Sequence, residues 1–140
     1  RRSSDLLVYT SGSTGVPKGV MLEHGNLSTF CAWHRKTYGM DENARIAAYA
    51  SYGFDACMHD IYPALTAGST IYIISEEMRL NLPALHGYFA ENGITHAFMT
   101  TQIGRQFAQM ENPGKLRLLT AGGEKMVPFA PKDIRTASFG

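Results

Sequence analysis

The segment from Tyr9 to Gly19 combines glycines, hydroxyl side chains and one lysine in a pattern suited to binding phosphate. Glycine adopts positive φ and lets the backbone approach an anion closely. Successive backbone N–H groups can form an anion-binding concavity, hydroxyls add donors, and Lys18 brings a point charge. The segment therefore predicts a phosphate-binding loop for a nucleotide. Its expected members are Ser11, Gly12, Ser13, Thr14, Gly15 and Lys18.

Two other interpretations of this segment are disfavoured by its sequence. In the P-loop of nucleotide hydrolases the lysine follows a glycine and precedes a serine or threonine. Here Pro17 precedes Lys18 and Gly19 follows it, so the local geometry differs. A Gly/Ser linker is flexible and polar, whereas apolar sequence resumes at Val20. A strand-like run before the loop and a helical pattern after it favour a strand, loop and helix arrangement.

A carboxylate and a histidine further along the chain are candidates for contact with a second ligand. Asp55 lies between Phe54 and an apolar segment with helical character. A carboxylate at a helix N-terminus often caps the helix. His59 lies one turn later, so both side chains can face one pocket. No second ligand is spaced with His59 to form a metal site, and no metal is expected.

Alternating strand and helix patterns must position these residues. The expected strands are 6–9, 45–50, 70–74, 95–99, 116–120 and 134–137. The expected helices are 26–38, 56–66, 80–92 and 101–110, with Gly39, Gly68 and Gly93 as terminators. This order is typical of an α/β fold with a mainly parallel sheet covered by helices.

The carboxyl ends of the strands are where ligands bind in such sheets. Several candidate segments follow expected strands: the phosphate loop, Thr100-Thr101, Gly122-Gly123 and Ser138-Phe139. We therefore expect one cleft at that edge of the sheet to collect them. For the Gly-Gly pair a simple tight turn is the alternative interpretation.

Composition narrows the possible partners and compartment. The 140 residues carry a formal net charge of +1 and are 44% hydrophobic, which gives no electrostatic reason to expect nucleic acid or an anionic membrane as partner. No apolar run approaches the ~20 residues that span a bilayer, and no signal-peptide pattern is found. Cys31 and Cys57 have no metal-ligand spacing and predict small buried side chains in a reducing, cytoplasmic compartment.

Several motifs, in order, resemble those of a known family. The segment from Tyr9 to Gly19 resembles the signature loop of the adenylate-forming (AMP-binding) enzymes, which include acyl-CoA ligases, luciferases and the adenylation domains of nonribosomal peptide synthetases. Phe54-Asp55-Ala56 and the segment from Leu119 to Met126 resemble the next two landmarks of peptide-synthetase adenylation domains. The segment from Ala137 to Gly140 resembles the start of a further motif. The resemblance covers essentially the whole chain.

The resemblance implies a domain organisation. Residues 1–140 would be part of the large N-terminal subdomain of an adenylation domain, truncated at both ends and without the C-terminal subdomain. The full-length parent would be an amino-acid-adenylating ligase, and the isolated piece is expected to be inactive.

The resemblance also implies roles for individual residues. Lys18 and Thr10 would act in catalysis by holding the departing phosphates of ATP, with Mg²⁺ sharing the charge. The expected ATP and AMP contacts are Thr10, Ser11, Gly12, Ser13, Thr14, Gly15, Lys18, Gly122, Gly123, Glu124, Ala137, Ser138 and Phe139. The expected substrate pocket is Asp55, Ala56, His59, Phe98, Thr120, Gly122 and Ser138. Asp55 would pair with the α-ammonium of an amino acid, and the pocket walls would suit a polar or aromatic side chain.

The implied reaction is activation of an amino acid as an aminoacyl-adenylate, followed by thioester transfer to the phosphopantetheine of a carrier protein. Carrier and condensation domains of a parent synthetase are the implied partners. An acyl- or aryl-CoA ligase shares the phosphate loop but has no use for an ammonium-binding Asp55. A stand-alone D-alanine ligase for a carrier protein and a non-catalytic nucleotide-binding module are the remaining alternatives.

Overall fold

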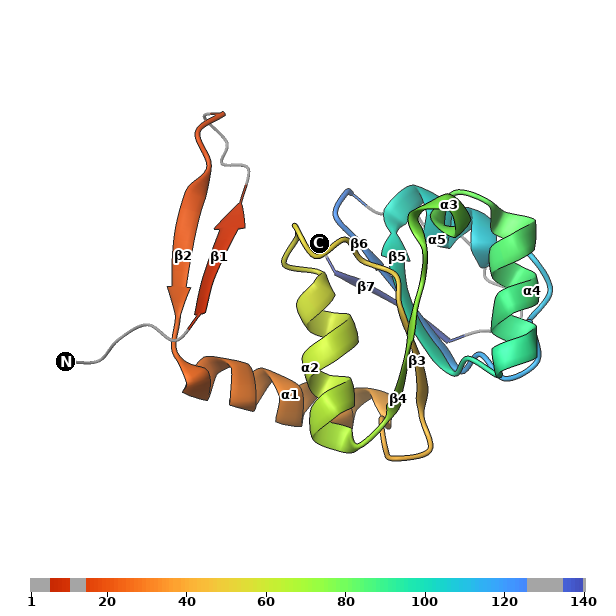
Figure 1. The fold of residues 1–140 in the computed structure, drawn as a ribbon, viewed down its shortest axis with the longest axis horizontal. Coiled ribbons are helices and arrows are strands. Elements are labelled where there is room, and N and C mark those ends of the chain that lie inside the picture. Colours follow the sequence, from red (N-terminus) through yellow and green to blue (C-terminus); the bar gives the residue numbers. More distant parts are fainter. Residues whose placement is uncertain (1–5, 11–14, 126–134, 140) are drawn as a thin grey trace.

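The computed structural model describes residues 6–10, 15–125 and 135–139, with backbone only for the last range. They form twelve elements, labelled in chain order in Figure 1. The strands are β1 (Leu6–Thr10), β2 (Lys18–Leu22), β3 (Arg45–Ala48), β4 (Thr70–Ile73), β5 (His96–Thr100), β6 (Leu118–Gly122) and β7 (Arg135–Phe139). The helices are α1 (His24–Tyr38), α2 (Cys57–Ala67), α3 (Glu76–Arg79), α4 (Leu82–Asn92) and α5 (Thr101–Phe107).

Five of the strands form one parallel sheet in the order β4-β3-β5-β6-β7. Parallel neighbours require crossover connections, and the helices that the sequence predicted between strands supply them. The register places Phe98 opposite Thr120 on β5 and β6, and Gly122 opposite Phe139 on β6 and β7. The predicted α/β class with a mainly parallel sheet is confirmed.

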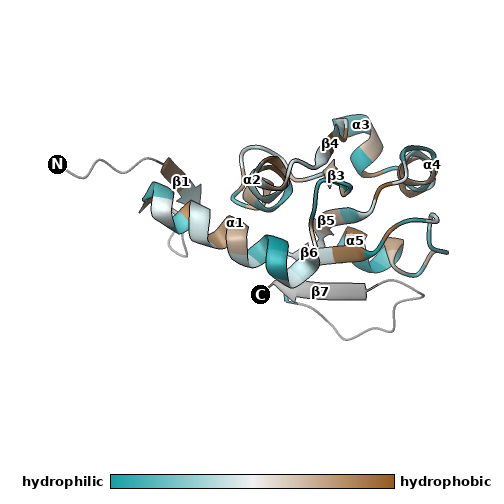
Figure 2. Ribbon diagram, turned by 90° about the horizontal axis from the view of Figure 1, so that it is seen from below, coloured by the Kyte–Doolittle hydropathy of each residue, from teal (hydrophilic) through white to brown (hydrophobic). Residues whose placement is uncertain are grey.

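Helices cover both faces of the sheet, α1 and α2 on one side and α4 and α5 on the other (Figures 1 and 2). The side chains of Phe89 and Phe107 are fully buried on the α4 and α5 side, with ring centroids 5.2 Å apart. Ala64 of α2 packs on Ile46 of β3 on the opposite side. Burial on both faces explains why the strands read as apolar runs rather than as an alternating pattern.

The predicted helix terminators hold. Gly39, Gly68 and Gly93 follow α1, α2 and α4 with φ of 65°, 72° and 58°. This left-handed conformation is strained for residues with a Cβ, so glycine at these positions ends each helix.

Three details differ from the sequence prediction. Residues 18–22 form a strand rather than leading directly into a helix, and β2 pairs antiparallel with β1 in a sheet separate from the parallel one. The expected helix over 80–92 is α4, which begins at Leu82 because the side chain of Asn81 accepts a capping hydrogen bond from the N–H of Ala84, and the short helix α3 before it was not expected. Ser138 and Phe139 lie within β7 rather than in a turn after it.

No helix within the described ranges combines the length and apolarity that crossing a bilayer requires.

Candidate functional site

Two residues that could bind a phosphate are paired at the loop end of the β1-β2 hairpin. The register pairs Thr10 with Lys18, and both side chains are exposed. Gly15, between the two strands, has a φ of 78°, which is the conformation that the glycine-rich pattern requires. Ser11, Gly12, Ser13 and Thr14 lie outside the described residues. The hairpin therefore holds a cation and a hydroxyl-bearing residue at opposite ends of the predicted phosphate loop.

The position of this loop corrects one expectation. β1 is not a strand of the parallel sheet, so the loop does not follow a strand at the carboxyl edge of that sheet. Figure 1 shows the hairpin standing apart from the sheet and joined to it through α1. The single cleft expected to collect all four segments is thus not formed by strand ends alone.

The end of β6 carries the second group of expected nucleotide contacts. Gly122 is buried as the last residue of β6, and Gly123 turns the chain with a φ of 98°. The hydroxyl of Thr101, at the start of α5, donates to the backbone oxygen of Glu124 over 3.0 Å. The backbone register places Ala137, Ser138 and Phe139 beside Thr120, Ala121 and Gly122. The ends of β6 and β7 therefore lie side by side in the parallel sheet.

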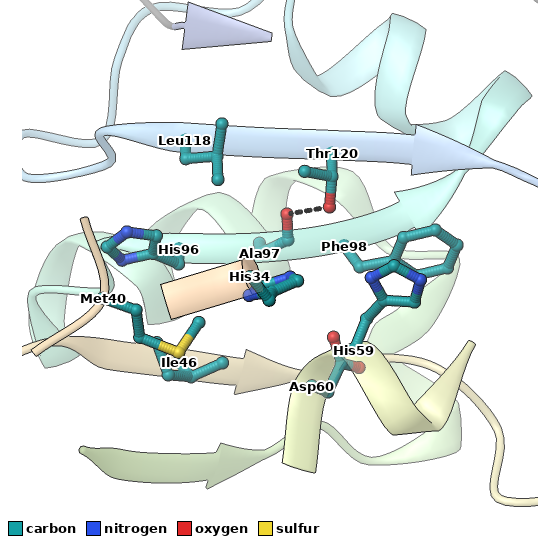
Figure 3. A pocket seen from close by; sticks show the side chains of 10 residues that line it. All are labelled: His34, Met40, Ile46, His59, Asp60, His96, Ala97, Phe98, Leu118 and Thr120. Carbon is teal, nitrogen blue, oxygen red and sulfur yellow. Dashed lines mark hydrogen bonds between the residues drawn. The ribbon is translucent and has the colours of Figure 1, made fainter. Parts of the chain in front are cut away.

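Three of the expected pocket residues come together between the sheet and α2 (Figure 3). The ring of His59 stacks on Phe98 with centroids 6.0 Å apart and planes 18° from parallel. Thr120 lies opposite Phe98 on the neighbouring strand, and its hydroxyl donates to the backbone oxygen of Ala97 over 3.3 Å. Residues far apart in sequence thus line one cavity.

The turn before α2 holds the expected ammonium-binding residue at the surface. Asp55 is exposed and does not line the cavity, whereas Ala56 is half-buried. Ala56 is the residue before the first helical position, and no side chain caps α2 by hydrogen bonding. Burial lowers the pKa of His59, and the charge of Asp55 acts against that shift. Asp55 is therefore placed near His59 with its carboxylate open to a ligand.

Sequence reasoning missed most of the remaining cavity wall. It is formed by His34, Met40, Ile46, Asp60, His96, Ala97 and Leu118. A signal existed in α1, where Phe30, His34 and Tyr38 recur at every fourth residue and so share one helix face. Such a stripe is usually core packing. Here it packs edge-on against His59, with ring centroids 4.9 Å away for Phe30 and 5.4 Å for His34.

The environment of the cavity opposes charge on both acids and bases. Burial, followed by the neighbouring His59 and His96, lowers the pKa of His34 to about 4. Burial raises the pKa of Asp60 to about 7, although one of its oxygens accepts hydrogen bonds from the N–H groups of Tyr49 and Ala50 at 2.9 Å each. Desolvation disfavours the charged form of any group. His34 is therefore neutral at pH 7.

The third histidine of the cavity is structurally satisfied. His96 Nδ1 lies 2.8 Å from the hydroxyl of Thr95, and its Nε2 lies 3.1 Å from the backbone oxygen of Tyr38. Both ring nitrogens are thus engaged, and the contact of Nε2 joins β5 to the end of α1.

Within the described ranges, no three His, Cys, Asp or Glu side chains are arranged to hold a metal ion. Cys31 and Cys57 are free thiols, and burial raises the pKa of both. Cys31 is buried as expected, whereas Cys57 is only partly so.

Comparison with known proteins decides the family. A sequence model of the AMP-binding enzymes matches residues 4–138. The chain belongs to the AMP-binding enzyme family. The chain is 43% identical over 120 residues to surfactin synthase subunit 2 of Bacillus subtilis (strain 168), covering 86% of the chain and 3% of that protein. It is 41% identical over 136 residues to bacitracin synthase 1 of Bacillus licheniformis, covering 96% of the chain and 3% of that protein.

Solved structures place the AMP-binding chain in the same fold. A crystal structure of a Vibrio cholerae adenylation domain in complex with glycyl-adenosine-5'-phosphate matches with a TM-score of 0.71 and 24% identity. The match covers 84% of this chain and 23% of that domain. The predicted resemblance to adenylate-forming enzymes is confirmed at the level of family and fold, and the similar curated proteins are peptide synthases many times longer than this chain.

Proposed function

We propose that this chain is the part of an adenylation domain that holds ATP and an amino acid. The complete protein activates the amino acid as an aminoacyl-adenylate and passes it to the phosphopantetheine thiol of a carrier protein. The observation that carries the proposal is the pairing of Thr10 with Lys18 at the loop end of the β1-β2 hairpin. Identity of 41–43% to peptide synthases supports the same activity.

Lys18 and Thr10 hold the phosphates that leave as pyrophosphate. An ammonium group and a hydroxyl on paired strands converge on one anion, while Gly15 lets the backbone N–H groups turn toward it. This is catalysis by positioning and electrostatics. Mg²⁺, when bound with ATP, shares the phosphate charge. The nucleoside lies at the carboxyl end of β6, where Gly122 and Gly123 leave room for a base beside the backbone.

Asp55 binds the α-ammonium of the substrate. Its carboxylate is exposed and acts electrostatically on His59 inside the cavity, and the N-cap of α2 has no side-chain hydrogen bond. A pair between a carboxylate and an ammonium group is strong and directional. The substrate is therefore an amino acid rather than a simple carboxylic acid.

The curated relatives also suggest the setting of the chain. The chain spans 3% of the length of surfactin synthase subunit 2 and 3% of the length of bacitracin synthase 1. We infer that it is a partial adenylation domain within a longer synthetase, working in the cytoplasm beside carrier and condensation domains, with the C-terminal subdomain outside this segment.

Amino-acid-dependent exchange of labelled pyrophosphate into ATP tests the proposal on the full-length protein. Exchange with one amino acid but not with its des-amino analogue is expected. The Asp55→Asn variant should lose that discrimination, whereas Glu91→Gln, an exposed carboxylate on α4, should keep it. Equal exchange with simple carboxylic acids would indicate an acyl- or aryl-CoA ligase. Preference for D-alanine alone would indicate a carrier-protein ligase, and exchange with no acid a non-catalytic nucleotide-binding module.

A further inference from the structure

His34 on α1 is a buried imidazole on the wall of the cavity that His59 and Phe98 also line (Figure 3). Its side chain is well covered, since the residue is 4% exposed. Within the described part of the chain, Nδ1 of His34 has no hydrogen-bond partner. A buried polar atom without a partner is rare in native proteins and calls for an explanation such as a ligand or an ordered water.

The neighbours of His34 hold its ring but do not satisfy this nitrogen. Its ring packs edge-on against Tyr38 at 4.7 Å and His59 at 5.4 Å between centroids. Phe30 adds a third ring at 5.5 Å. The imidazole is therefore fixed in place by aromatic contacts while one polar atom stays available, which is the arrangement of a preformed recognition group.

We propose that His34 is a specificity-determining residue that hydrogen-bonds the end of the substrate side chain, so that the preferred amino acid carries an uncharged hydroxyl or carboxamide. This inference rests on the proposed amino-acid-activating function. The free space in the cavity is about that of one water molecule, and a single polar terminal group fills it.

The charge state of the cavity supports an uncharged group. Burial holds His34 neutral and raises the pKa of Asp60 on the same cavity wall to about 7. The environment that opposes charge on these two side chains also opposes it on a substrate. A neutral imidazole nitrogen either donates or accepts a hydrogen bond, depending on its tautomer, so hydroxyl and amide groups both suit it.

Three other polar residues of the cavity wall already have hydrogen-bond partners. Both ring nitrogens of His96 have partners, and the hydroxyl of Thr120 donates to Ala97. One oxygen of Asp60 accepts two backbone N–H groups. His34 thus combines burial, a fixed ring and an available nitrogen.

The test compares amino acids matched in shape but not in polarity, using pyrophosphate exchange by the full-length protein. Threonine is paired with valine, and asparagine with leucine. A site built to hydrogen-bond a polar group rejects the analogue that lacks it far more strongly than an apolar pocket does. We expect the parent protein to favour the polar member of at least one pair by more than about tenfold in kcat/KM.

Variants of His34 then test whether its Nδ1 causes the preference for polar amino acids. His34→Phe keeps a ring against Phe30 and Tyr38 but removes Nδ1, and should reduce the polar preference at least tenfold while the KM for ATP stays unchanged. His34→Asn keeps a polar atom on the same carbon as Nδ1 and should retain most of the preference. If the phenylalanine variant does not fold, His34→Leu serves the same comparison with a smaller side chain.

Each outcome decides the role of His34. If the polar preference survives in the phenylalanine or leucine variant, the proposed role of His34 is wrong. The role is also wrong if the parent protein favours valine, leucine or a charged amino acid. Loss of the preference in the asparagine variant to the same extent also overturns it, because packing rather than the nitrogen would then matter. Exchange with no amino acid at all would contradict the proposed function itself and this inference with it.

Discussion

The imidazole of His59 lies nearly parallel to the ring of Phe98, with 6.0 Å between centroids and 18° between planes. One ring comes from α2 and the other from β5, so the contact joins the helix that follows Asp55 to the centre of the parallel sheet. Stacked aromatic rings stabilise such a contact beyond the area they bury. The pocket is therefore bounded by a pair of rings rather than by one side chain.

Replacing Phe98 with alanine should change both stability and substrate choice. The ring is 7% exposed, so its loss should cost about 3–5 kcal/mol of unfolding free energy. The vacated space should admit larger amino acids, measured as a rise in their kcat/KM in pyrophosphate exchange. Phe54→Ala, at an exposed ring, is the control that should leave stability within about 0.5 kcal/mol of the parent.

Replacing Lys18 with alanine should slow adenylation without unfolding the protein. Lys18 is exposed, so the melting temperature should stay unchanged. Loss of one group that stabilises developing phosphate charge should reduce pyrophosphate exchange by about 10²-fold. Lys36→Ala, which removes an exposed lysine from α1, should leave the rate intact. Equal exchange by Lys18→Ala and the parent would exclude the phosphate-binding role.

The parts of the fold that could be predicted from sequence are those with strong local signals. Gly39 and Gly93 mark helix ends because few other residues adopt their backbone conformation easily. The resemblance to adenylation domains placed His59 and Phe98 in one pocket, and both line the same cavity.

Other parts depend on contacts that local sequence does not encode. β2 was missed because its five residues begin with Lys18-Gly19 and acquire strand structure only by pairing with β1. His34 carries no local signal of contact with a ligand, because an aromatic stripe on a helix usually packs in a core. Its role became visible only when α1 was placed against His59. The exposed position of Asp55 likewise depends on the turn geometry before α2.

Packing between α5 and the sheet should be sensitive to a single methyl group. A Cβ on Gly104 would meet Cβ of Ala121 at 3.2 Å and Cβ of Met99 at 3.4 Å. Gly104→Ala should push α5 away from β5 and β6, destabilising the protein by about 1–3 kcal/mol. Because α5 carries Thr101, which binds the backbone of Glu124, the KM for ATP should rise as well.

A second helical glycine provides the matched control for this change. A Cβ on Gly87 of α4 would meet no atom within 4 Å. Gly87→Ala should therefore stabilise the protein by roughly 0.5–1 kcal/mol through helix propensity alone. Chemical denaturation of both variants would measure the contrast, and the same sign for the two would contradict the close packing of α5.

The two buried groups with the largest pKa shifts should give stability profiles of opposite slope. The pKa of Asp60 rises from 3.8 to about 7 on folding, because burial disfavours its charge. Its contribution to stability is greatest below pH 3.8 and is lost as the pH rises through 7. The pKa of His34 falls from 6.5 to about 4. Its contribution is present above pH 6.5 and is lost as the pH falls through 4.

Single substitutions should separate these opposing effects. Asp60→Asn keeps an oxygen for the N–H groups of Tyr49 and Ala50 but cannot ionise. Its unfolding free energy should rise between pH 4 and 6.5 more steeply than that of the parent, with roughly 3 kcal/mol supplied by His34. In His34→Asn only Asp60 still titrates. The unfolding free energy of this variant should therefore fall more steeply than that of the parent as the pH rises from 4 to 6.5. Denaturant unfolding at a series of pH values measures all three proteins. Parallel profiles would mean that neither group changes its proton affinity on folding. Divergent profiles would establish that the cavity excludes charge of either sign, which is the property that an uncharged substrate side chain requires.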